Sequence, residues 1–375
     1  MKPKPKIAIL ANFPAWLYTD KLPRFSGHYA VWLVALHEAF GKQEDFEIHW
    51  VTLSKDVASS LSFLSNNQHI HVLPRISRTV GQFTFYRHDR RQVAAVLQQI
   101  EPDMVHSWGT EDCYGLCAKD FKGPKLHSVQ GALRACMQRA KFPRFMHIQS
   151  WYEPGVWKSF HHMTTESPWA ADRVREICPE IHPFIWEYAV EQRFFVCTRA
   201  ISEQPLCLYS GADSPLKNVD TLIAAFSTPE LSHITLKLAG VNPAGRPGLP
   251  DNIKALGRVG RDEMVELLSE AWALVHMSLA DTGPTIAKEA RVVGLPVIIS
   301  DQCGSTQHVE DGKSGFILAP HDVPGLVKAV LAVTRDAPTS LTMGAHGHEE
   351  CRRALSADTM VNDLLDIYRK VLSEK

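Results

Sequence analysis

Residues 273–315 hold the stretch that decides the fold, and Asp281-Thr-Gly-Pro-Thr-Ile-Ala-Lys-Glu289 lies at its centre. The apolar run Ala273-Leu-Val-His-Met277 predicts a buried strand. A turn follows, then a predicted helix from about Thr285 to Val293, and Pro296-Val-Ile-Ile-Ser300 predicts the next strand. Together these segments form one strand–helix–strand unit.

The turn in the middle of this unit is a candidate ligand site. Ligands of such units gather at the carboxyl end of the first strand. There, Asp281 stands in the turn and Glu289 on the helix, while the free amides at the start of the helix favour an anion. We therefore expect a phosphate-bearing ligand, and take a nucleotide diphosphate sugar as the working hypothesis.

Length and composition indicate an ordinary globular protein with more than one domain. At 375 residues the natural expectation is two α/β domains, and 45% hydrophobic with 22% charged residues is typical of such proteins. A net charge of -1 favours neither nucleic acid nor a membrane as a partner. Basic residues nevertheless crowd two regions of the first half, as solvated loop charge or as a surface for an anionic acceptor: Arg75, Arg78, Arg87, Arg90 and Arg91, then Arg134, Arg139, Lys141 and Arg144.

Cysteine usage and hydropathy bear on the compartment. The eight cysteines show no metal-site spacing, so reduced thiols in a cytosolic protein are the best interpretation. The first residues lack the apolar core of a signal peptide, and no apolar run reaches about 18 residues. We expect a cytoplasmic protein, with the inner face of the membrane as an alternative location and at most peripheral contact through the basic clusters.

Strands and helices alternate along the whole chain. In the first half, buried strands are predicted at Ile7–Ala11, Glu47–Leu53, His71–Leu73, Asp103–Trp108 and Lys125–Val129, and helices at Tyr29–Phe40, Arg90–Ile100 and Pro168–Cys178. Residues 132–165 have weak periodicity and many aromatic and basic residues, which favours a substrate-facing loop region.

The alternation restarts after an irregular stretch at Ile181–Pro205. Strands are predicted at Leu206–Tyr209, Ile234–Ala239 and Gly315–Leu318, and helices at Val219–Phe226, at Asp262–Glu270 with Asp262 as its cap, and across 323–334, 341–354 and 358–372. This pattern predicts an α/β fold of two doubly wound Rossmann-like domains that face each other across a cleft. We expect an acceptor-side domain at 1–187, a nucleotide-sugar-binding domain at 188–357, and a terminal helix at 358–375 that packs back on the first domain.

Several motifs of the second half resemble those of the retaining glycosyltransferases of family 4, which have the GT-B architecture. The resemblance is strongest over Leu206–Gly315. It rests on Gly211-Ala-Asp-Ser-Pro-Leu-Lys217, Leu238-Ala-Gly240, Leu256-Gly-Arg-Val259, Asp281–Glu289, Gly294-Leu-Pro-Val297 and Glu310-Asp-Gly312-Lys-Ser-Gly315. The first half resembles the family more loosely, through Ser26-Gly27 and Glu101-Pro-Asp-Met-Val-His106.

The resemblance implies a role for each matching residue. Lys217 would neutralise the donor diphosphate, and Asp281 would face the transferred sugar. Glu289 would accept hydrogen bonds from the ribose hydroxyls. The remaining donor-binding positions would be Gly27, Gly211, Val259, Gly283, Pro284, Thr285 and Ile286, and His106, Trp108 and Gln130 would lie on the sugar and acceptor side.

Structural interpretations stay open for these residues. Asp281 also fits an ordinary turn residue, and Glu289 and Lys217 also fit solvated surface positions. We expect His106 to be a packed core histidine that points to the opposite face of its strand from Trp108. Two departures from the family pattern stand out: Ala212 replaces a common arginine, whose contact Arg258 or Arg261 would supply, and Trp108 replaces a common histidine.

The resemblance implies a retaining, metal-independent transferase of hexosyl type. It would move a sugar from a nucleotide-diphosphate-sugar donor to a glycan, lipid-linked or small-molecule acceptor. No cofactor, metal or nucleic acid would take part. Two alternatives remain: a GT-B nucleotide-sugar epimerase, for which Glu111, Asp112 and Glu166 are unassigned carboxylates, and a non-catalytic protein that binds a nucleotide sugar or a partner transferase.

Overall fold

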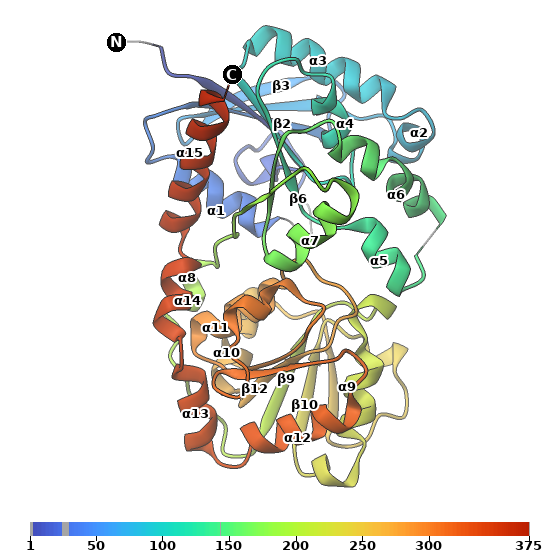
Figure 1. The fold of residues 1–375 in the computed structure, drawn as a ribbon, viewed down its shortest axis with the longest axis vertical. Coiled ribbons are helices and arrows are strands. Elements are labelled where there is room, and N and C mark those ends of the chain that lie inside the picture. The colour runs from blue at the N-terminus through green and yellow to red at the C-terminus, as the bar shows by residue number, and fades with distance from the viewer. Residues whose placement is uncertain (1–2, 25–29, 143, 375) are drawn as a thin grey trace. The chain divides into compact units, whose positions relative to one another are not determined.

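The computed structural model describes residues 3–24, 30–142 and 144–374, which form two compact units (Figure 1). Unit 1 consists of Met1–Arg134, Phe142–Ala189 and Ala357–Lys375. Unit 2 consists of Ala135–Lys141 and Val190–Ser356. The chain therefore enters unit 2 twice, for the short segment Ala135–Lys141 and for Val190–Ser356, and returns to unit 1 each time.

Unit 1 is built on an eight-stranded sheet with the order β3-β4-β2-β1-β5-β6-β7-β8. Its strands are β1 (Lys6–Leu10), β2 (Glu47–Ser54), β3 (Leu61–Ser65), β4 (Gln68–Pro74), β5 (Met104–Trp108), β6 (Lys125–Val129), β7 (His162–Thr165) and β8 (Phe184–Ile185). Only β3 pairs antiparallel among these strands. The strand order reverses at the neighbouring pair β1 and β5, where doubly wound sheets bind ligands.

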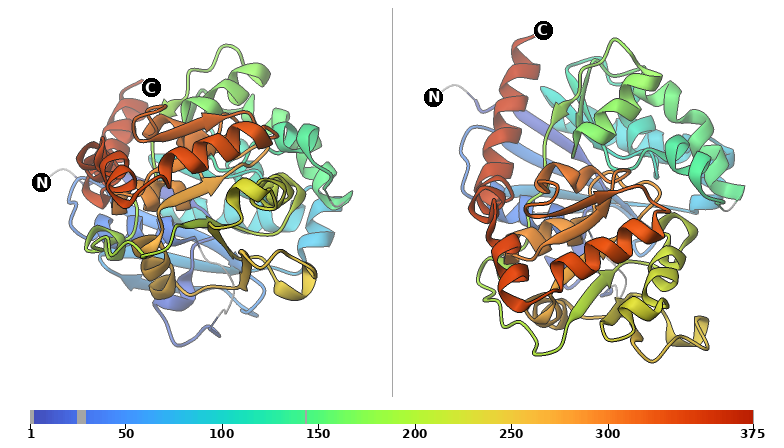
Figure 2. Two further views of the ribbon diagram at one scale, coloured as in Figure 1. Left: turned by 90° about the horizontal axis from the view of Figure 1, so that it is seen from below. Right: turned by 60° about the horizontal axis from the view of Figure 1, so that its bottom comes forward.

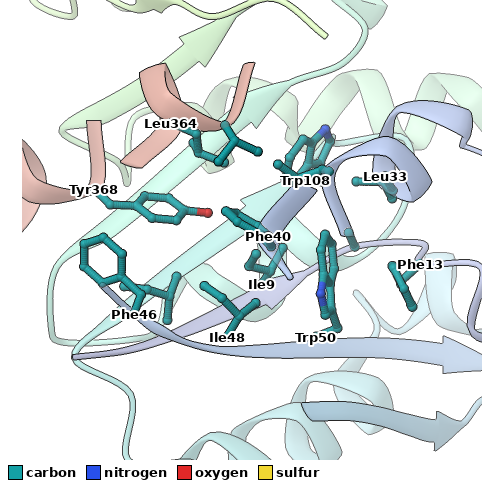
Figure 3. Close-up of a cluster of buried hydrophobic side chains, with 14 of the residues drawn as sticks. Ile9, Phe13, Leu33, Phe40, Phe46, Ile48, Trp50, Trp108, Leu364 and Tyr368 are labelled. Atoms are coloured by element: carbon teal, nitrogen blue, oxygen red, sulfur yellow. The ribbon is translucent and has the colours of Figure 1, made fainter. Parts of the chain in front are cut away.

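Helices cover both sides of this sheet. They are α1 (Val31–Phe40), α2 (Arg78–Phe83), α3 (Arg87–Ile100), α4 (Tyr114–Lys119), α6 (Arg144–Trp157), α7 (Pro168–Ile177) and α15 (Ala357–Ser373). The short helix α5 (Leu133–Arg139) begins in unit 1, but most of it belongs to the segment Ala135–Lys141 of unit 2. The returning helix α15 lies beside α1 (Figure 1). Figure 3 shows how Leu364 and Tyr368 of α15 pack with Phe40, Ile48 and Trp50 in one buried apolar cluster. The last helix is thus part of the core of unit 1.

Unit 2 is built on a six-stranded parallel sheet with the order β11-β10-β9-β12-β13-β14. Its strands are β9 (Leu206–Ser210), β10 (Thr235–Ala239), β11 (Ile253–Gly257), β12 (Ala273–His276), β13 (Val297–Ser300) and β14 (Gly315–Leu318). Two apolar clusters fill the opposite sides of this sheet. They explain why the strands read as nearly continuous apolar runs in the sequence.

The helices of unit 2 are α8 (Gln192–Phe195), α9 (Val219–Phe226), α10 (Arg261–Glu270), α11 (Thr285–Val293), α12 (Val323–Val333), α13 (Ala337–Ala345) and α14 (His348–Ala354). Some of them connect its parallel strands, whereas α8 precedes the first strand and α12, α13 and α14 follow the last one. Figure 2 shows α12, in orange-red, beside the orange strands β13 and β14. Helix α11 has the predicted bounds, and Gly294 ends it in the left-handed conformation with φ 80°.

Three local predictions are wrong. Residues 132–165 are largely regular, with α5, α6 and β7, because several of their aromatic side chains, Tyr152, Trp157 and Phe160, are buried core residues and do not belong to a loop surface. Asp262 does not cap α10, whose N-cap is Gly260 without a side-chain hydrogen bond. The segment predicted as one helix at 341–354 is divided between α13 and α14, because Gly347 adopts φ 67°.

Strand β3 was not predicted at all. It forms a hairpin with β4 through Asn66 and Asn67, which both have positive φ, 49° and 59°. A two-residue turn of this kind favours asparagine, so the Asn-Asn pair was the available signal.

Candidate functional site

The candidate site of unit 2 lies at the carboxyl ends of β9 and β12. These neighbouring strands are the point at which the order of the sheet reverses. The loop after β9 leads to the short 3-10 helix Pro215–Lys217, and the loop after β12 contains Asp281. Two loops far apart in the sequence therefore meet where doubly wound sheets bind ligands.

Lys217 and Asp281 form an ion pair at this edge. The Lys217 ammonium donates to Oδ2 of Asp281. The same carboxylate oxygen lies 3.3 Å from Nε2 of His276, the last residue of β12, and Ser278 Oγ lies 2.9 Å from that nitrogen. His276 was not predicted as a site residue; a polar residue at the end of an apolar strand was the available signal.

The charges in this group are mutually compensated. Burial alone would raise the pKa of Asp281, but Lys217 and His276 hold this pKa well below its usual range. Burial would lower the pKa of Lys217, but Asp281 raises it. Both side chains are therefore ionised at neutral pH, and the ammonium is a fixed positive charge near the helix start.

The main chain also fixes Asp281 in place. Its amide donates to the carbonyl of Gln302 at 3.0 Å, and its carbonyl accepts from the amide of Gly304 at 2.8 Å. The Asp281 side chain is only 14% exposed. Asp281 is therefore a buried, ion-paired residue and more than a solvated turn former.

The start of α11 has the features of an anion site. Its N-cap is Pro284, which makes no side-chain cap, and its first turn carries no acidic residue. The carbonyl of Pro284 accepts from Ser305 Oγ at 3.2 Å, which holds the turn in place. The first-turn amides of Thr285 and Ile286 thus carry the positive end of the helix dipole.

Glu289 lies one turn further along α11 and is buried. Its carboxylate accepts from Nη2 of Arg261, the first residue of α10, and Arg261 also pairs with Glu191. Burial raises the pKa of Glu289 to about 7, against the lowering effect of Arg261. Glu289 is therefore no solvated surface residue, but part of its acceptor capacity is taken by Arg261.

A close backbone contact and an ion pair shape the loop after β9. A Cβ on Gly240 would lie 2.3 Å from the carbonyl oxygen of Gly211, so no larger residue fits at Gly240. Beside Ala212, Asp213 is held in a bidentate pair by Arg246, with distances of 2.8 and 2.6 Å. Arg246 is a cation near this loop that the sequence analysis did not single out.

The remaining predicted donor residues of unit 2 lie at the same sheet edge. Gly211 follows β9, and Gly283 and Pro284 connect Asp281 to α11. Val259 lies between β11 and α10, where it packs on an apolar cluster. Arg258, one of the two expected substitutes for the missing arginine at Ala212, is exposed, whereas Arg261 is occupied by its two carboxylates.

The carboxyl edge of unit 1 carries a separate cavity of about 500 Å³. Trp108 and Gln130 line it, together with aromatic side chains of the loop after β1, Phe13 and Trp16. Gly27, the predicted donor contact of this half, lies outside the described residues.

His106 was predicted to point to the opposite face of its strand from Trp108, and this prediction is wrong. The two rings stack at 4.5 Å, because residues i and i+2 of a strand share a face. His106 is fully buried, and its ring nitrogens contact the Tyr368 hydroxyl at 2.8 Å and Ser128 Oγ at 2.7 Å. These contacts favour a packed core histidine.

Buried charges near this edge were also not predicted. Arg75 binds Asp112 through two hydrogen bonds of 2.9 and 2.7 Å, so it is a structural member of the first basic cluster. Burial raises the pKa of both Glu111 and Glu153 to about 7. Glu153 accepts from the amides of Leu133 and Arg134 at the start of α5.

Unit 2 is similar in sequence to known glycosyltransferases. The family model described as "Glycosyl transferases group 1" matches residues 192–350. The chain is 28% identical over 182 residues to a D-inositol 3-phosphate glycosyltransferase of Streptomyces avermitilis, covering 43% of this chain and 39% of that protein. It is 30% identical over 125 residues to the lipopolysaccharide glucosyltransferase WaaG of Escherichia coli, covering 31% of this chain and 33% of WaaG. The matches thus span about two fifths or less of the length of these relatives.

Solved structures resemble the whole chain in fold. Sucrose-phosphate synthase from Thermosynechococcus elongatus gives a TM-score of 0.80 at 16% identity, over 99% of this chain and 100% of that one. Anabaena HepE, solved with UDP and glucose, gives 0.68 at 14% identity, over 97% and 99%. These neighbours confirm the predicted α/β fold with two Rossmann-like domains. The similarity to group 1 glycosyl transferases at the level of the family model lies in residues 192–350, most of unit 2.

Within the described part of the chain, no helix combines the length and the apolar character that a membrane span requires.

Proposed function

We propose that this protein is a retaining glycosyltransferase that moves a hexose from a nucleotide-diphosphate sugar to an acceptor. The observation that carries the proposal is the meeting of Lys217, Asp281 and the uncapped start of α11 at the switch point of the unit 2 sheet. A fixed ammonium beside free helix amides is suited to a diphosphate. HepE, solved with UDP and glucose, makes UDP-sugars the first donors to test.

Lys217 would do the main electrostatic work. Charge grows on the diphosphate as the bond to the sugar breaks, and a preorganised ammonium stabilises that charge. Asp281 holds the ammonium in position and, through His276, is itself oriented. In this proposal, Lys217 and the α11 amides supply the positive charge at the diphosphate, and no metal ion is required.

Asp281 and Glu289 would hold the two ends of the donor. Glu289 would accept from the vicinal ribose hydroxyls when it is ionised, since a carboxylate binds two donors well. Before the donor binds, the Arg261 guanidinium compensates part of the negative charge of Glu289. Asp281 would face the sugar, so its length and position would bear on which sugar is accepted.

The cavity of unit 1 is the proposed acceptor site. Its aromatic lining, Phe13, Trp16 and Trp108, suits the apolar faces of a sugar or inositol ring. Arg78 also lines it and would favour an acceptor with an anionic group. The inositol 3-phosphate in the name of the Streptomyces avermitilis relative supports the proposal of an anionic acceptor.

The test is turnover of a panel of UDP-, GDP- and ADP-sugars with and without acceptor sugars. Transfer with the donor's anomeric configuration retained, measured by nuclear magnetic resonance, is the expected result. Lys217→Ala should lower the rate of transfer by about 10²–10³-fold or more, whereas Lys254→Ala, at an exposed lysine of β11, should leave it unchanged. Inverted product, or full activity of Lys217→Ala, would overturn the proposal.

Neither the matched family nor the curated relatives named above favour the alternatives. An epimerase would convert the donor sugar without any acceptor, and a binding protein would retain the nucleotide without turnover. The same nuclear magnetic resonance experiment separates these outcomes.

We also propose that unit 1 touches an anionic membrane surface, which fits a cytoplasmic enzyme with a lipid-linked acceptor. Large apolar side chains of α2 and α6 are exposed: Phe83 by 71%, Trp151 by 73% and Val80 by 56%. Phe83 and Trp151 line a shallow hollow of about 340 Å³. Arg87 and Arg91 of α3, the helix that follows α2 in the chain, are also exposed. Aromatic and basic side chains together favour anionic membrane interfaces.

Co-sedimentation with vesicles tests this contact. The full chain should bind vesicles that contain phosphatidylserine or phosphatidylglycerol and not pure phosphatidylcholine. The double variant Phe83→Ser/Trp151→Ser should lose binding, whereas Val196→Ser, at another exposed apolar residue, should not. Binding by the double variant at the unaltered level would contradict the proposal.

A further inference from the structure

A second cluster of chemistry-bearing side chains lies in unit 1, at the amino ends of β2 and β4. Glu47 and His49 belong to β2, and His69 and His71 to β4. His49 and His69 are register partners of the parallel strands. Since residues i and i+2 share a face, all four side chains project from one face of the sheet.

The ring geometry confirms this shared face. The His49 and His69 rings stack at 4.6 Å with an angle of 10° between their planes. His49 and His71 stack at 5.4 Å and 8°. This face carries three imidazoles and one carboxylate at the end of the strands opposite to the cavity of unit 1.

The ligand atoms of Glu47, His49 and His69 have the spacing of a metal site. Glu47 Oε1 lies 2.8 Å from His49 Nε2 and 3.8 Å from His69 Nε2, and all three atoms fall within 4.8 Å of one another. Ligands about 2.0–2.1 Å from a tetrahedral zinc ion stand roughly 3.3 Å apart. Small rotations would reach this spacing, because the Glu47 and His69 side chains are 38% and 46% exposed.

His71 is placed to orient His49. Its Nε2 lies 3.1 Å from His49 Nδ1, and its Nδ1 lies 3.0 Å from Ser62 Oγ. If His49 directs the lone pair of Nε2 at a cation, its Nδ1–H donates to His71, whose Nδ1–H then donates to Ser62. One tautomer of each ring satisfies this whole chain, and metal-binding histidines are usually oriented in this way.

The protonation states agree with this arrangement. Burial lowers the pKa of His49, and it lowers the pKa of His71 to about 4, with a smaller contribution from the neighbouring rings. Both imidazoles are therefore neutral at physiological pH, the form that binds a metal.

We propose that Glu47, His49 and His69 bind a zinc ion, with His71 as a positioning residue. Two imidazoles and one carboxylate suit zinc, whereas calcium and magnesium prefer oxygen ligands alone. The exposed side would leave a fourth position for water. The ion would join β2 to β4 and so stabilise the outer part of the unit 1 sheet. This site does not depend on the proposed glycosyl transfer.

Zinc titration of the metal-free full chain, in competition with a chromogenic chelator, tests the proposal. We expect one zinc ion per chain with micromolar or tighter affinity, and a higher thermal unfolding midpoint when zinc is present. His69→Ala and Glu47→Gln should each weaken binding at least tenfold. Both changes are at exposed side chains, and circular dichroism of the metal-free variants checks that they fold. His233→Ala, at an exposed histidine of unit 2, is the matched control.

X-ray absorption of the zinc-loaded chain separates this site from binding by the eight cysteines. Nitrogen and oxygen ligands without sulfur are expected. His71→Phe should weaken binding about tenfold while the same ligand signature remains, as expected of a positioning residue. Sulfur ligation, unchanged affinity in His69→Ala/Glu47→Gln, or no binding tighter than about 10 µM overturns the proposal.

Discussion

The carboxyl edges of the two sheets differ in chemistry although their strand orders reverse in the same way. In unit 2, each buried carboxylate named as a site residue has a cation: Lys217 pairs with Asp281, and Arg261 with Glu289. In unit 1, aromatic side chains line the cavity, and Glu111 and Glu153 lie near the edge with pKa values raised to about 7.

If unit 2 binds the donor and unit 1 the acceptor, as proposed, this difference matches two kinds of ligand. Compensated charges in unit 2 keep a cation fixed and ready for an anionic ligand. The aromatic lining of the unit 1 cavity, with Gln130 and Arg78 beside it, suits a ligand bound through ring contacts and hydrogen bonds. We therefore expect substitutions at the unit 2 site to change the rate of the chemical step. Those in unit 1 should change acceptor binding and the pH dependence of the free energy of unfolding.

The largest expected effect is that of Lys217→Ala. If its ammonium stabilises the departing diphosphate, kcat should fall by about 10²–10³-fold or more. The change also leaves Asp281 buried without its cation, so the free energy of unfolding should fall by about 3 kcal/mol. Steady-state kinetics and denaturant unfolding measure the two effects.

Two further variants separate chemistry from stability. The double variant Lys217→Met/Asp281→Asn should regain much of the lost stability and none of the activity. Lys217→Arg should keep the ion pair and part of the activity. Recovery of activity in the double variant would show that the fixed charge is not catalytic.

The next effect in size concerns Glu289. With a pKa of about 7, its carboxylate is progressively protonated below neutral pH, so the donor KM should rise about tenfold from pH 8 to pH 6. Glu289→Gln should raise KM and remove most of this dependence. Glu230→Gln, at an exposed glutamate of unit 2, is the control. A wild-type KM independent of pH over this range would rule out the ribose contact.

A smaller effect is expected at Glu111. Its pKa in the folded protein is about 7, above its ordinary value of 4.5. The stability that this group contributes is therefore complete below about pH 4.5 and is lost as the pH rises through 7. Glu111→Gln should flatten the fall in stability between pH 5.5 and 7 by about 1 kcal/mol per pH unit. Thermal unfolding at each pH measures it, with Glu44→Gln as an exposed control in unit 1; identical slopes in all three proteins would refute it.

The smallest effect is expected at the β3–β4 hairpin, which has no counterpart in unit 2. Asn67 adopts φ 59°, which costs most residues other than glycine and asparagine about 1 kcal/mol. Asn67→Ala should therefore lower the unfolding free energy by about 1 kcal/mol, whereas Asn67→Gly should leave it unchanged or raise it. Equal stability of the alanine and glycine variants would speak against the turn geometry.

The sequence predicted the inner strands of the unit 2 sheet better than it predicted residues 132–165. The inner strands β9, β12 and β13 of unit 2 are buried on both faces, so their apolar runs and the turn residues Gly211, Gly240 and Gly294 mark the elements directly. The edge strand β11, which is only partly buried, was not among the predicted strands. Residues 132–165 were wrongly predicted as a loop region because aromatic and basic residues obscured the helical period of α5 and α6.

Side-chain partners could not be predicted, because they depend on residues distant in sequence. Lys217 and Asp281 are 64 positions apart, and Arg261 and Glu289 are 28 apart. The sequence indicated three of these four as ligand contacts and Arg261 as a substitute cation. It did not indicate that they would bind each other. The pKa values of Glu111 and Glu153 follow from burial, which a pattern of residues does not show.

The return of the chain to unit 1 has a consequence for biosynthesis. Tyr368 contacts His106, and the carbonyl of Met360 accepts from the Trp186 indole at 2.8 Å, yet residues 357–373 follow the main part of unit 2 in the chain. During translation, residues 190–356 emerge before α15 does. Unit 2 can thus complete its sheet on the ribosome while unit 1, although made first, must wait with an open apolar groove. Chaperones that bind nascent chains should therefore meet this groove of unit 1.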